Sequence, residues 1–69
     1  MPNGRNLKHI LERIYNHKSL NGIDLRNLYL SFMNFNGLEL RRTDLEGCCL
    51  SHAFMDGCDL TNANLTNEK

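Results

Sequence analysis

A five-residue repeat runs through residues 23–65 and constrains the fold more than any other feature of the chain. Written in fives, the stretch reads IDLRN, LYLSF, MNFNG, LELRR, TDLEG, CCLSH, AFMDG, CDLTN and ANL. The third place of every unit is apolar, and its residues are Leu25, Leu30, Phe35, Leu40, Leu45, Leu50, Met55, Leu60 and Leu65. Since 41% of the chain is apolar, chance would give such a run roughly once in three thousand registers.

This period fits neither of the two ordinary secondary structures. On a helix, steps of five residues move around the axis, because one turn takes about 3.6 residues. On a straight strand, such steps alternate between the two faces, because side chains repeat every two residues. A uniform apolar set at every fifth residue therefore requires a backbone that turns regularly. That is typical of a solenoid whose stacked repeats share one core.

The repeat resembles the pentapeptide-repeat family, whose motif is A-(D/N)-L-x-x. The segment CDLTNANL at 58–65 fits this motif almost letter for letter, and IDLRN and TDLEG fit it well. The resemblance implies a mainly β fold, a right-handed, four-sided parallel β-helix with one pentapeptide per face and four per coil. It implies just over two coils for this chain, with residues twenty apart stacked at about 4.8 Å. Leu25, Leu45 and Leu65 would then form one inward ladder of the core.

A short amphipathic segment precedes the repeats. Apolar residues recur there at helical spacing, namely Leu7, Ile10, Leu11 and Ile14. We expect a helix over 6–17, capped by Asn3 or Asn6, that docks on the open first coil because it would be marginal alone. The chain would thus divide into a capping helix at 1–19 and a β-helix at 20–69. A helix that lies on a membrane or in a partner's groove is the alternative interpretation.

Cysteine usage and hydropathy predict a location. Three cysteines, two of them adjacent, argue against a disulfide framework and favour a reducing compartment. The sequence shows no secretory signal, and no stretch approaches the ~20 apolar residues of a membrane span. We therefore expect a cytoplasmic protein, of a cell or of a phage-infected host, with no membrane partner. The net charge is zero, which names no partner by itself.

No residue set predicts catalysis or metal binding. In the repeat register, Cys48 and Cys58 point inward on opposite faces, whereas Cys49 and His52 point outward. Their spacing is not that of a zinc site. The sequence also lacks a phosphate-binding loop, a dinucleotide fingerprint and a nucleophile–base pair. We expect a protein that is not an enzyme and that takes no cofactor and no metal.

The outward residues of the repeats fall into two groups on opposite sides. The acidic side carries Asp24, Glu39, Asp44, Glu46 and Asp59, interrupted by Arg26, Arg41 and Arg42. The aromatic side carries Tyr29, Phe32 and Phe54. Stacked carboxylates can mark catalysis, but the resemblance implies that second-place Asp and Asn residues bond nearby backbone groups instead. An exposed aromatic cluster is typical of an interface, unless the rings tuck against the helix or a corner.

The resemblance also bears on function. Some members of the family mimic duplex DNA and bind DNA-handling enzymes such as type II topoisomerases. We therefore expect a protein-binding module, most specifically a small inhibitor of a DNA-handling host enzyme, with another protein as partner and no direct nucleic-acid binding. The alternative is a self-associating structural scaffold without an inhibitory target.

A homodimer is the oligomeric state that we expect from the sequence. Two surfaces are candidates for the contact between copies, the end of the solenoid at 48–69 and the aromatic side. The sequence favours the end, because an uncovered end exposes both core residues and backbone edges.

Overall fold

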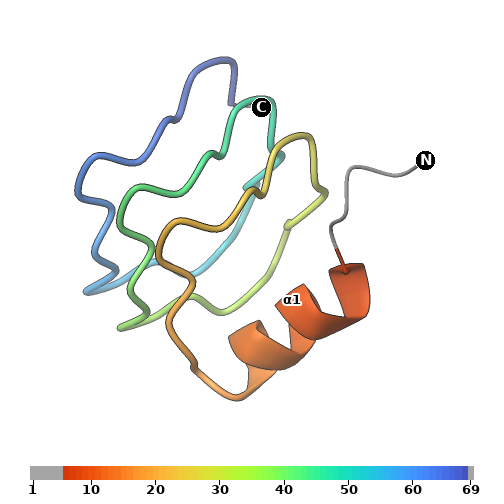
Figure 1. Cartoon of the computed structure of the whole chain (residues 1–69), viewed down its shortest axis with the longest axis vertical. Helices are drawn as coiled ribbons and strands as arrows, with labels where there is room; N and C mark the ends of the chain where they lie inside the picture. Colours follow the sequence, from red (N-terminus) through yellow and green to blue (C-terminus); the bar gives the residue numbers. More distant parts are fainter. Residues whose placement is uncertain (1–5, 69) are drawn as a thin grey trace.

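The computed structural model describes residues 6–68 and shows one helix followed by a chain that winds in stacked coils (Figure 1). The helix, α1, spans Leu7–Tyr15. Within residues 6–68 the coils contain no extended strand. They are joined instead by isolated parallel β-bridges, each between residues twenty apart: Asp24 with Asp44, Tyr29 with Cys49, Asn34 with Phe54, Glu39 with Asp59, and Asp44 with Asn64.

The expected β structure is thus reduced to single bridges, because the backbone turns sharply every five residues. Each such turn is a corner of the coil. The described residues with a left-handed φ, seven non-glycine and four glycine, recur every five residues from His17 to Asn67, with φ between 53° and 73°. At each corner from Leu25 on, the N–H of a first-place residue donates to the preceding third-place carbonyl, as Met33 does to Leu30 at 3.3 Å. A turn that recurs every five residues leaves one bridging residue per face and prevents a longer strand.

Helix α1 is shorter than the sequence predicts. It begins as expected after Asn6, whose side chain accepts a hydrogen bond from the His9 N–H at 3.0 Å. The other candidate cap, Asn3, lies outside the described residues. The helix ends at Tyr15 rather than at residue 17, because His17 already has the left-handed φ of 53° that belongs to the corner series. The end of the helix is therefore also the first corner of the coil register.

The core runs along the axis and becomes more open toward the later coils. Leu25, Leu30, Phe35, Leu40 and Leu45 are at most 2% exposed. The following third-place residues Leu50, Met55 and Leu60 are half-buried. Leu65, expected in the core, is instead 41% exposed. Within residues 6–68 no further coil lies over Leu65, so its inward position does not by itself bury it.

The core also begins earlier than the repeat pattern suggested. Leu20 is fully buried, and its N–H donates to the carbonyl of Glu39 at 2.9 Å. Gly22 extends the same pairing, since its N–H donates to the carbonyl of Arg41 at 2.8 Å. Residues 18–22 (KSLNG) thus behave as one more repeat unit, with Leu20 in its third place.

Helix α1 packs against the first coil through its apolar stripe. Ile10 and Ile14 are buried in the same cluster as Leu20 and Leu25. Large first-place residues of the first coil, among them Leu28 and Met33, pack against this cluster and lie beside the helix. These long side chains fit because they contact the helix. In the next coil the first-place residues are small, namely Thr43, Cys48, Ala53 and Cys58. Within residues 6–68, no helix has the length and hydrophobicity needed to cross a membrane.

Candidate protein-interaction surfaces

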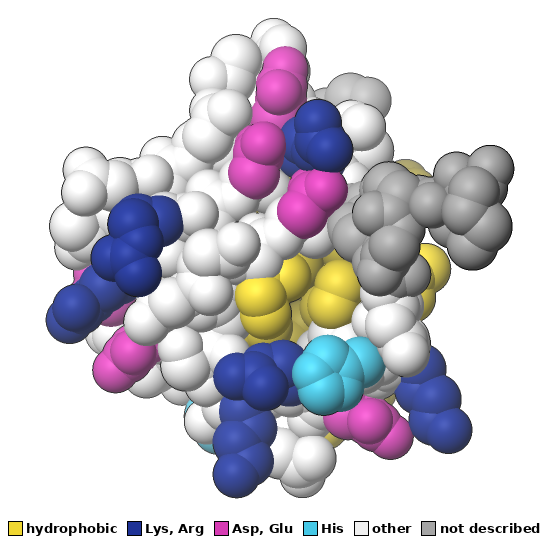
Figure 2. All heavy atoms as spheres, viewed as in Figure 1, with side chains coloured by type: hydrophobic (Ala, Val, Ile, Leu, Met, Phe, Trp, Pro, Cys, Tyr) yellow, Lys and Arg dark blue, Asp and Glu magenta, His cyan; other side chains and the backbone are white. Residues whose placement is uncertain are grey.

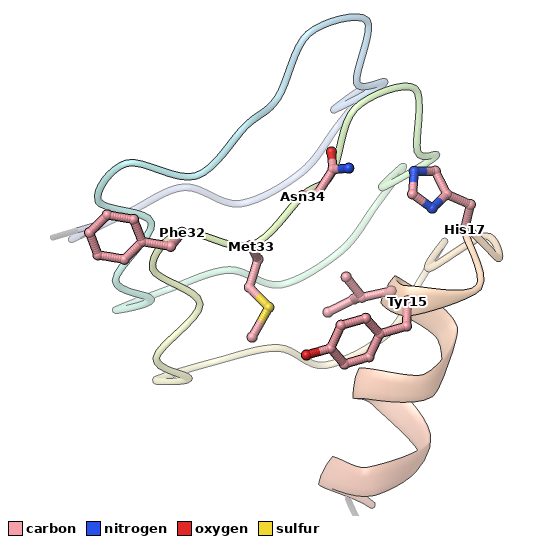
Figure 3. A pocket seen from close by; sticks show the side chains of 6 residues that line it. Tyr15, His17, Phe32, Met33 and Asn34 are labelled. Carbon is pink, nitrogen blue, oxygen red and sulfur yellow. The ribbon is translucent and has the colours of Figure 1, made fainter.

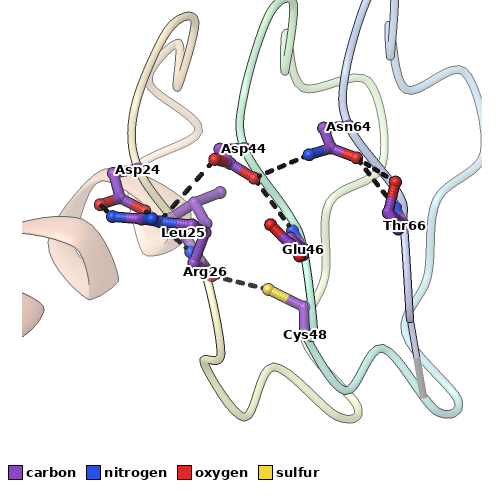
Figure 4. Close-up of polar contacts among 8 residues, drawn as sticks. All are labelled: Asp24, Leu25, Arg26, Asp44, Glu46, Cys48, Asn64 and Thr66. Atoms are coloured by element: carbon purple, nitrogen blue, oxygen red, sulfur yellow. Dashed lines mark hydrogen bonds and ion pairs between the residues drawn. The ribbon is translucent and has the colours of Figure 1, made fainter.

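The acidic side is built on a ladder of second-place residues, Asp24, Asp44 and Asn64, which face one another across successive coils (Figure 4). The Arg26 guanidinium binds the Asp24 carboxylate through two contacts of 3.0 Å, and its Nε lies 3.7 Å from Oδ2 of Asp44. The Asn64 amide donates to Asp44 at 3.3 Å. One arginine therefore bridges two stacked carboxylates, and the hydrogen bond with Asp24 raises the pKa of its guanidinium.

A second ladder on the acidic side joins Glu39 to Asp59. The Arg41 Nε lies 2.7 Å from Oδ2 of Asp59, and the Asn21 amide donates to Glu39 at 2.9 Å. A hydrogen bond from the Thr61 hydroxyl, followed by the contact with Arg41, lowers the pKa of Asp59 from 3.8 to about 2. The Asp59 carboxylate therefore stays ionised at every physiological pH.

The same second-place side chains also hold the local backbone. Oδ1 of Asp24 accepts a hydrogen bond from the Arg26 N–H at 3.0 Å, and the same contact to the residue two places on recurs down the chain. In the same way, an Oδ1 atom accepts the backbone N–H two residues later at Asn34 (3.0 Å), Asp44 (3.2 Å), Asp59 (3.1 Å) and Asn64 (3.0 Å). This is the Asx-turn geometry that Asp and Asn commonly adopt. An asparagine serves this purpose as well as an aspartate, so the local structure requires no charge at these sites.

The charge of the acidic side is partly cancelled by its own arginines. Its five carboxylates stand against three guanidinium groups, those of Arg26, Arg41 and Arg42, which leaves a formal charge of −2. Figure 2 shows acidic side chains next to a basic one on the face in view. The side remains acidic, but with a mixed surface instead of an unbroken row of carboxylates.

The aromatic side projects into solvent. Tyr29 is 82% exposed, Phe32 68% and Phe54 58%, so none of the three tucks against the helix or a corner. The Phe32 ring stacks on His52 of the next coil, with ring centroids 5.0 Å apart and an angle of 15° between the planes. Both residues occupy corners, with φ of 64° and 61°. A left-handed backbone costs a non-glycine residue about 1–2 kcal/mol, and a large side chain seldom adopts it.

A groove lies beside this corner, between the end of α1 and the first coil (Figure 3). Its volume is about 320 Å³, and it is lined by Ile14, Tyr15, His17, Phe32, Met33 and Asn34. The Met33 side chain and the Tyr15 ring lie toward the groove, whereas the Phe32 ring points away from it. The sequence analysis placed none of Tyr15, His17 or Asn34 at a site. Tyr15 stands five residues before Leu20 and His17 fifteen before Phe32, but this spacing does not reveal what packs beside the helix end.

The cysteines sit in structural surroundings. The buried Cys48 thiol donates to the Leu25 carbonyl at 2.6 Å, and Cys49 lies 3.1 Å from the Ser31 hydroxyl. Burial, and to a lesser extent the nearby Asp59 charge, raises the pKa of the Cys58 thiol. Among residues 6–68, no group of three or more His, Cys, Asp or Glu residues is arranged to hold a metal ion.

A comparison with known protein families finds a match for this architecture. The family model described as pentapeptide repeats matches the chain in eight copies, over residues 17–56 and 39–67. The match begins before residue 23 and so includes the unit around Leu20. Neither a curated protein nor a solved structure matched the chain.

Proposed function

The chain belongs to the pentapeptide-repeat family, and we propose that it is a protein-binding module whose acidic side imitates the charge of duplex DNA toward a DNA-handling enzyme. Proteins of this family are β-helix solenoids that generally act as non-enzymatic interaction or structural modules. The proposal takes the solenoid to be a right-handed, four-sided β-helix of just over two coils. It also places the protein in the cytoplasm, of a cell or of a phage-infected host.

The observation that carries the proposal is the stacking of carboxylates on successive coils. Asp24 faces Asp44, and Glu39 faces Asp59, each across a parallel bridge. Charges held at the spacing of bridged chains, about 4.8 Å, lie on a rigid frame and need no ordering when a partner binds. Enzymes that handle DNA bind backbone charge without reading sequence, so stacked carboxylates with a net negative charge can occupy the same basic surface.

The partner class can be tested with a purified type II topoisomerase in a DNA-supercoiling assay. We expect the protein to inhibit supercoiling, and we expect the inhibition to weaken as salt is raised, because the contact is electrostatic. The triple variant Asp24→Asn/Asp44→Asn/Asp59→Asn should lose the inhibition and remain folded, since asparagine keeps the Asx-turn contacts that Asn34 and Asn64 already make.

The matched control is Asp56→Asn, which removes a carboxylate from residues 48–57 on the other half of the solenoid. It should inhibit as well as the parent protein. Inhibition that is insensitive to salt, or that survives in the triple variant, would exclude the acidic side as the contact. An absence of inhibition would exclude the topoisomerase.

A structural scaffold is the second candidate function, and the ion pairs favour it. Arg26 and Arg41 engage the stacked carboxylates within the chain itself, which joins the coils and lowers the charge that a partner would meet. If the protein is a scaffold, Arg26→Ala would reduce its stability and would have no effect on the topoisomerase. In a DNA mimic, the same substitution would strengthen inhibition of the topoisomerase, because it leaves the acidic side more negative.

A further inference from the structure

One corner of the solenoid differs from the others in the residues that occupy it. Most left-handed positions are filled by Gly or Asn, the residue types that tolerate this backbone best. Corners that stack on one another form columns, and three of the four columns contain at least one Gly or Asn among the described residues. The column of Phe32 and His52 contains neither. Two ring-bearing side chains are therefore held where the backbone disfavours them.

The half of the solenoid around this corner is also poor in charge. Residues 28–37 and 48–57 contain no Lys or Arg and a single carboxylate, Asp56. Apart from Asp56, the charged residues of 23–65 lie on the other half of the coils. Depletion of charge together with enrichment of aromatic residues is the composition of the buried centre of protein interfaces. Strain that is retained at an exposed site indicates that the side chains there serve a contact.

We propose that this corner, formed by Tyr29, Phe32, His52 and Phe54, is the surface through which two copies of the chain pair. At roughly 200 Å² for a fully exposed aromatic side chain, the exposed parts of the three aromatic residues amount to about 400 Å². Tyr15, which is 77% exposed and lines the adjoining groove, extends this patch. With Tyr15 included, the exposed aromatic area is about 570 Å², the larger part of the ~800 Å² per partner of a standard interface.

The shape of the surface suits a pair related by two-fold symmetry. The Phe32 ring projects from a convex corner and points away from the groove of about 320 Å³ beside it. In a two-fold pair, a patch that carries both a projection and a hollow meets its own copy, so each ring enters the partner's groove. Within residues 28–37 and 48–57, Asp56 is the single Asp, Glu, Lys or Arg, so the solenoid's part of the contact desolvates little charge.

This surface replaces the end of the solenoid, which the sequence favoured. Among the third-place residues at that end, Leu65 is 41% exposed, while Leu50, Met55 and Leu60 are half-buried. The aromatic corner exposes larger side chains to a greater extent. The inference is independent of the DNA-mimic proposal, since the two surfaces lie on opposite halves of the coil.

Analytical ultracentrifugation of the full chain over a range of concentrations tests the pairing. We expect a reversible dimer in the micromolar range. Phe32→Asn should weaken dimerisation at least tenfold, the size of loss that removal of an interface hot spot produces. Asparagine also suits the left-handed backbone, so the dilute monomer of this variant should melt at a higher temperature than the parent monomer. Such a rise in melting temperature would exclude unfolding as the cause of dissociation.

Arg42→Asn is the matched control, because Arg42 is another non-glycine corner residue, with φ of 56°, on the charged half. It should relieve the same backbone strain and leave the dimer intact. A second interface variant, Phe54→Ser, should dissociate the dimer without changing a corner. A parent protein that is monomeric at every concentration would overturn the proposal. A dimer that persists in the Phe32→Asn variant would overturn it as well. If Leu65→Glu then dissociates that dimer, the contact lies at the end of the solenoid.

Discussion

The guanidinium of Arg41 lies 2.7 Å from the carboxylate of Asp59, a residue eighteen positions later in the chain and one coil further along the axis. Asp59 also accepts hydrogen bonds from the Thr61 hydroxyl at 2.5 Å and from the Thr61 N–H at 3.1 Å. Each of these donors favours the charged carboxylate over the protonated one. Asp59 thus links two coils through its charge, and its oxygen also holds the local turn.

The first prediction concerns the pH dependence that follows from Asp59. Its pKa is lowered in the folded state from 3.8 to about 2. Since the folded pKa lies below the unfolded one, Asp59 contributes stability that is fully present above about pH 4 and is lost as the pH falls toward 2. Thermal melting followed at several pH values should show this loss of stability. In the Asp59→Asn variant, the melting temperature should fall less between pH 4 and pH 2 than in the parent protein.

Thr61→Val is the sharper variant for this prediction, because it removes the hydroxyl that makes the largest contribution to the shift. Titration of the Asp59 carboxyl by NMR should then give a pKa closer to 3.8 than in the parent protein. A carboxyl that titrates at its ordinary value in the parent protein would show that neither Thr61 nor Arg41 holds the charged form in solution.

The second prediction is a gradient of mutational cost along the core. Leu45 is 1% exposed, Leu60 is half-buried and Leu65 is 41% exposed, although all three occupy the third place of a repeat. Leu45→Ala should cost about 2–5 kcal/mol, the usual loss for a fully buried leucine, and Leu45→Asp should abolish folding because it buries an unpaired charge. Leu60→Ala should cost less, and Leu65→Ala least.

Denaturant unfolding of the three alanine variants measures this order. Equal losses at the three sites would mean that the end of the solenoid is covered in solution, which end-to-end pairing of two copies would achieve. The gradient therefore also bears on which surface forms a dimer.

The third prediction concerns helix α1 as a cap. Ile10 and Ile14 are 4% and 3% exposed and share the core cluster of the first coil. Removal of residues 1–18 would uncover that cluster, so we expect aggregation or a loss of cooperative melting. The milder variant Ile10→Ala/Ile14→Ala should fold with a lower melting temperature. A deletion variant that stays monomeric and melts cooperatively would favour a targeting role for the helix.

The sequence predicted the spacing of the coils well and the surfaces less well, for physical reasons that particular residues show. The apolar third place is a strong signal of a solenoid, and the family resemblance implied the interval of twenty residues at which Asp24 and Asp44, beside Leu25 and Leu45, form a bridge. Leu20 was missed because the first place of its unit is Lys18, which breaks the pattern that the later units share. The strain at Phe32 could not be read from the sequence, because a five-residue period fixes where a corner falls and leaves its φ unknown.

The contacts of the acidic side were also beyond the sequence. Arg26 and Arg41 were expected to interrupt the carboxylates, but which carboxylates they engage depends on side-chain conformations across coils. Thr61, which dominates the pKa of Asp59, stands two residues after it, and an Asp-x-Thr spacing was the available signal. Local bonds of this kind can be anticipated in every repeat unit that has an Asp or Asn in its second place.

The last prediction separates backbone strain from steric contact at the corners. Gly37 and Gly47 have nearly the same left-handed φ, 73° and 72°. A Cβ added at Gly37 meets no atom within 4 Å, whereas one added at Gly47 would clash with Oδ1 of Asn27. Gly37→Ala should therefore cost about 1–2 kcal/mol, the strain of a left-handed alanine. Gly47→Ala should cost more, because the Asn27 side chain must also move.

The pair Asn27→Gly and Gly47→Ala forms a double-mutant cycle that isolates the steric part. Glycine is well tolerated at residue 27, where φ is 60°, and it removes the side chain that a Cβ at residue 47 would meet. In the Asn27→Gly background, Gly47→Ala should cost no more than Gly37→Ala does in the parent protein. Denaturant unfolding of the single and double variants gives the coupling. If it is zero, the Asn27 side chain moves aside without cost, and the corners resist substitution through their backbone alone.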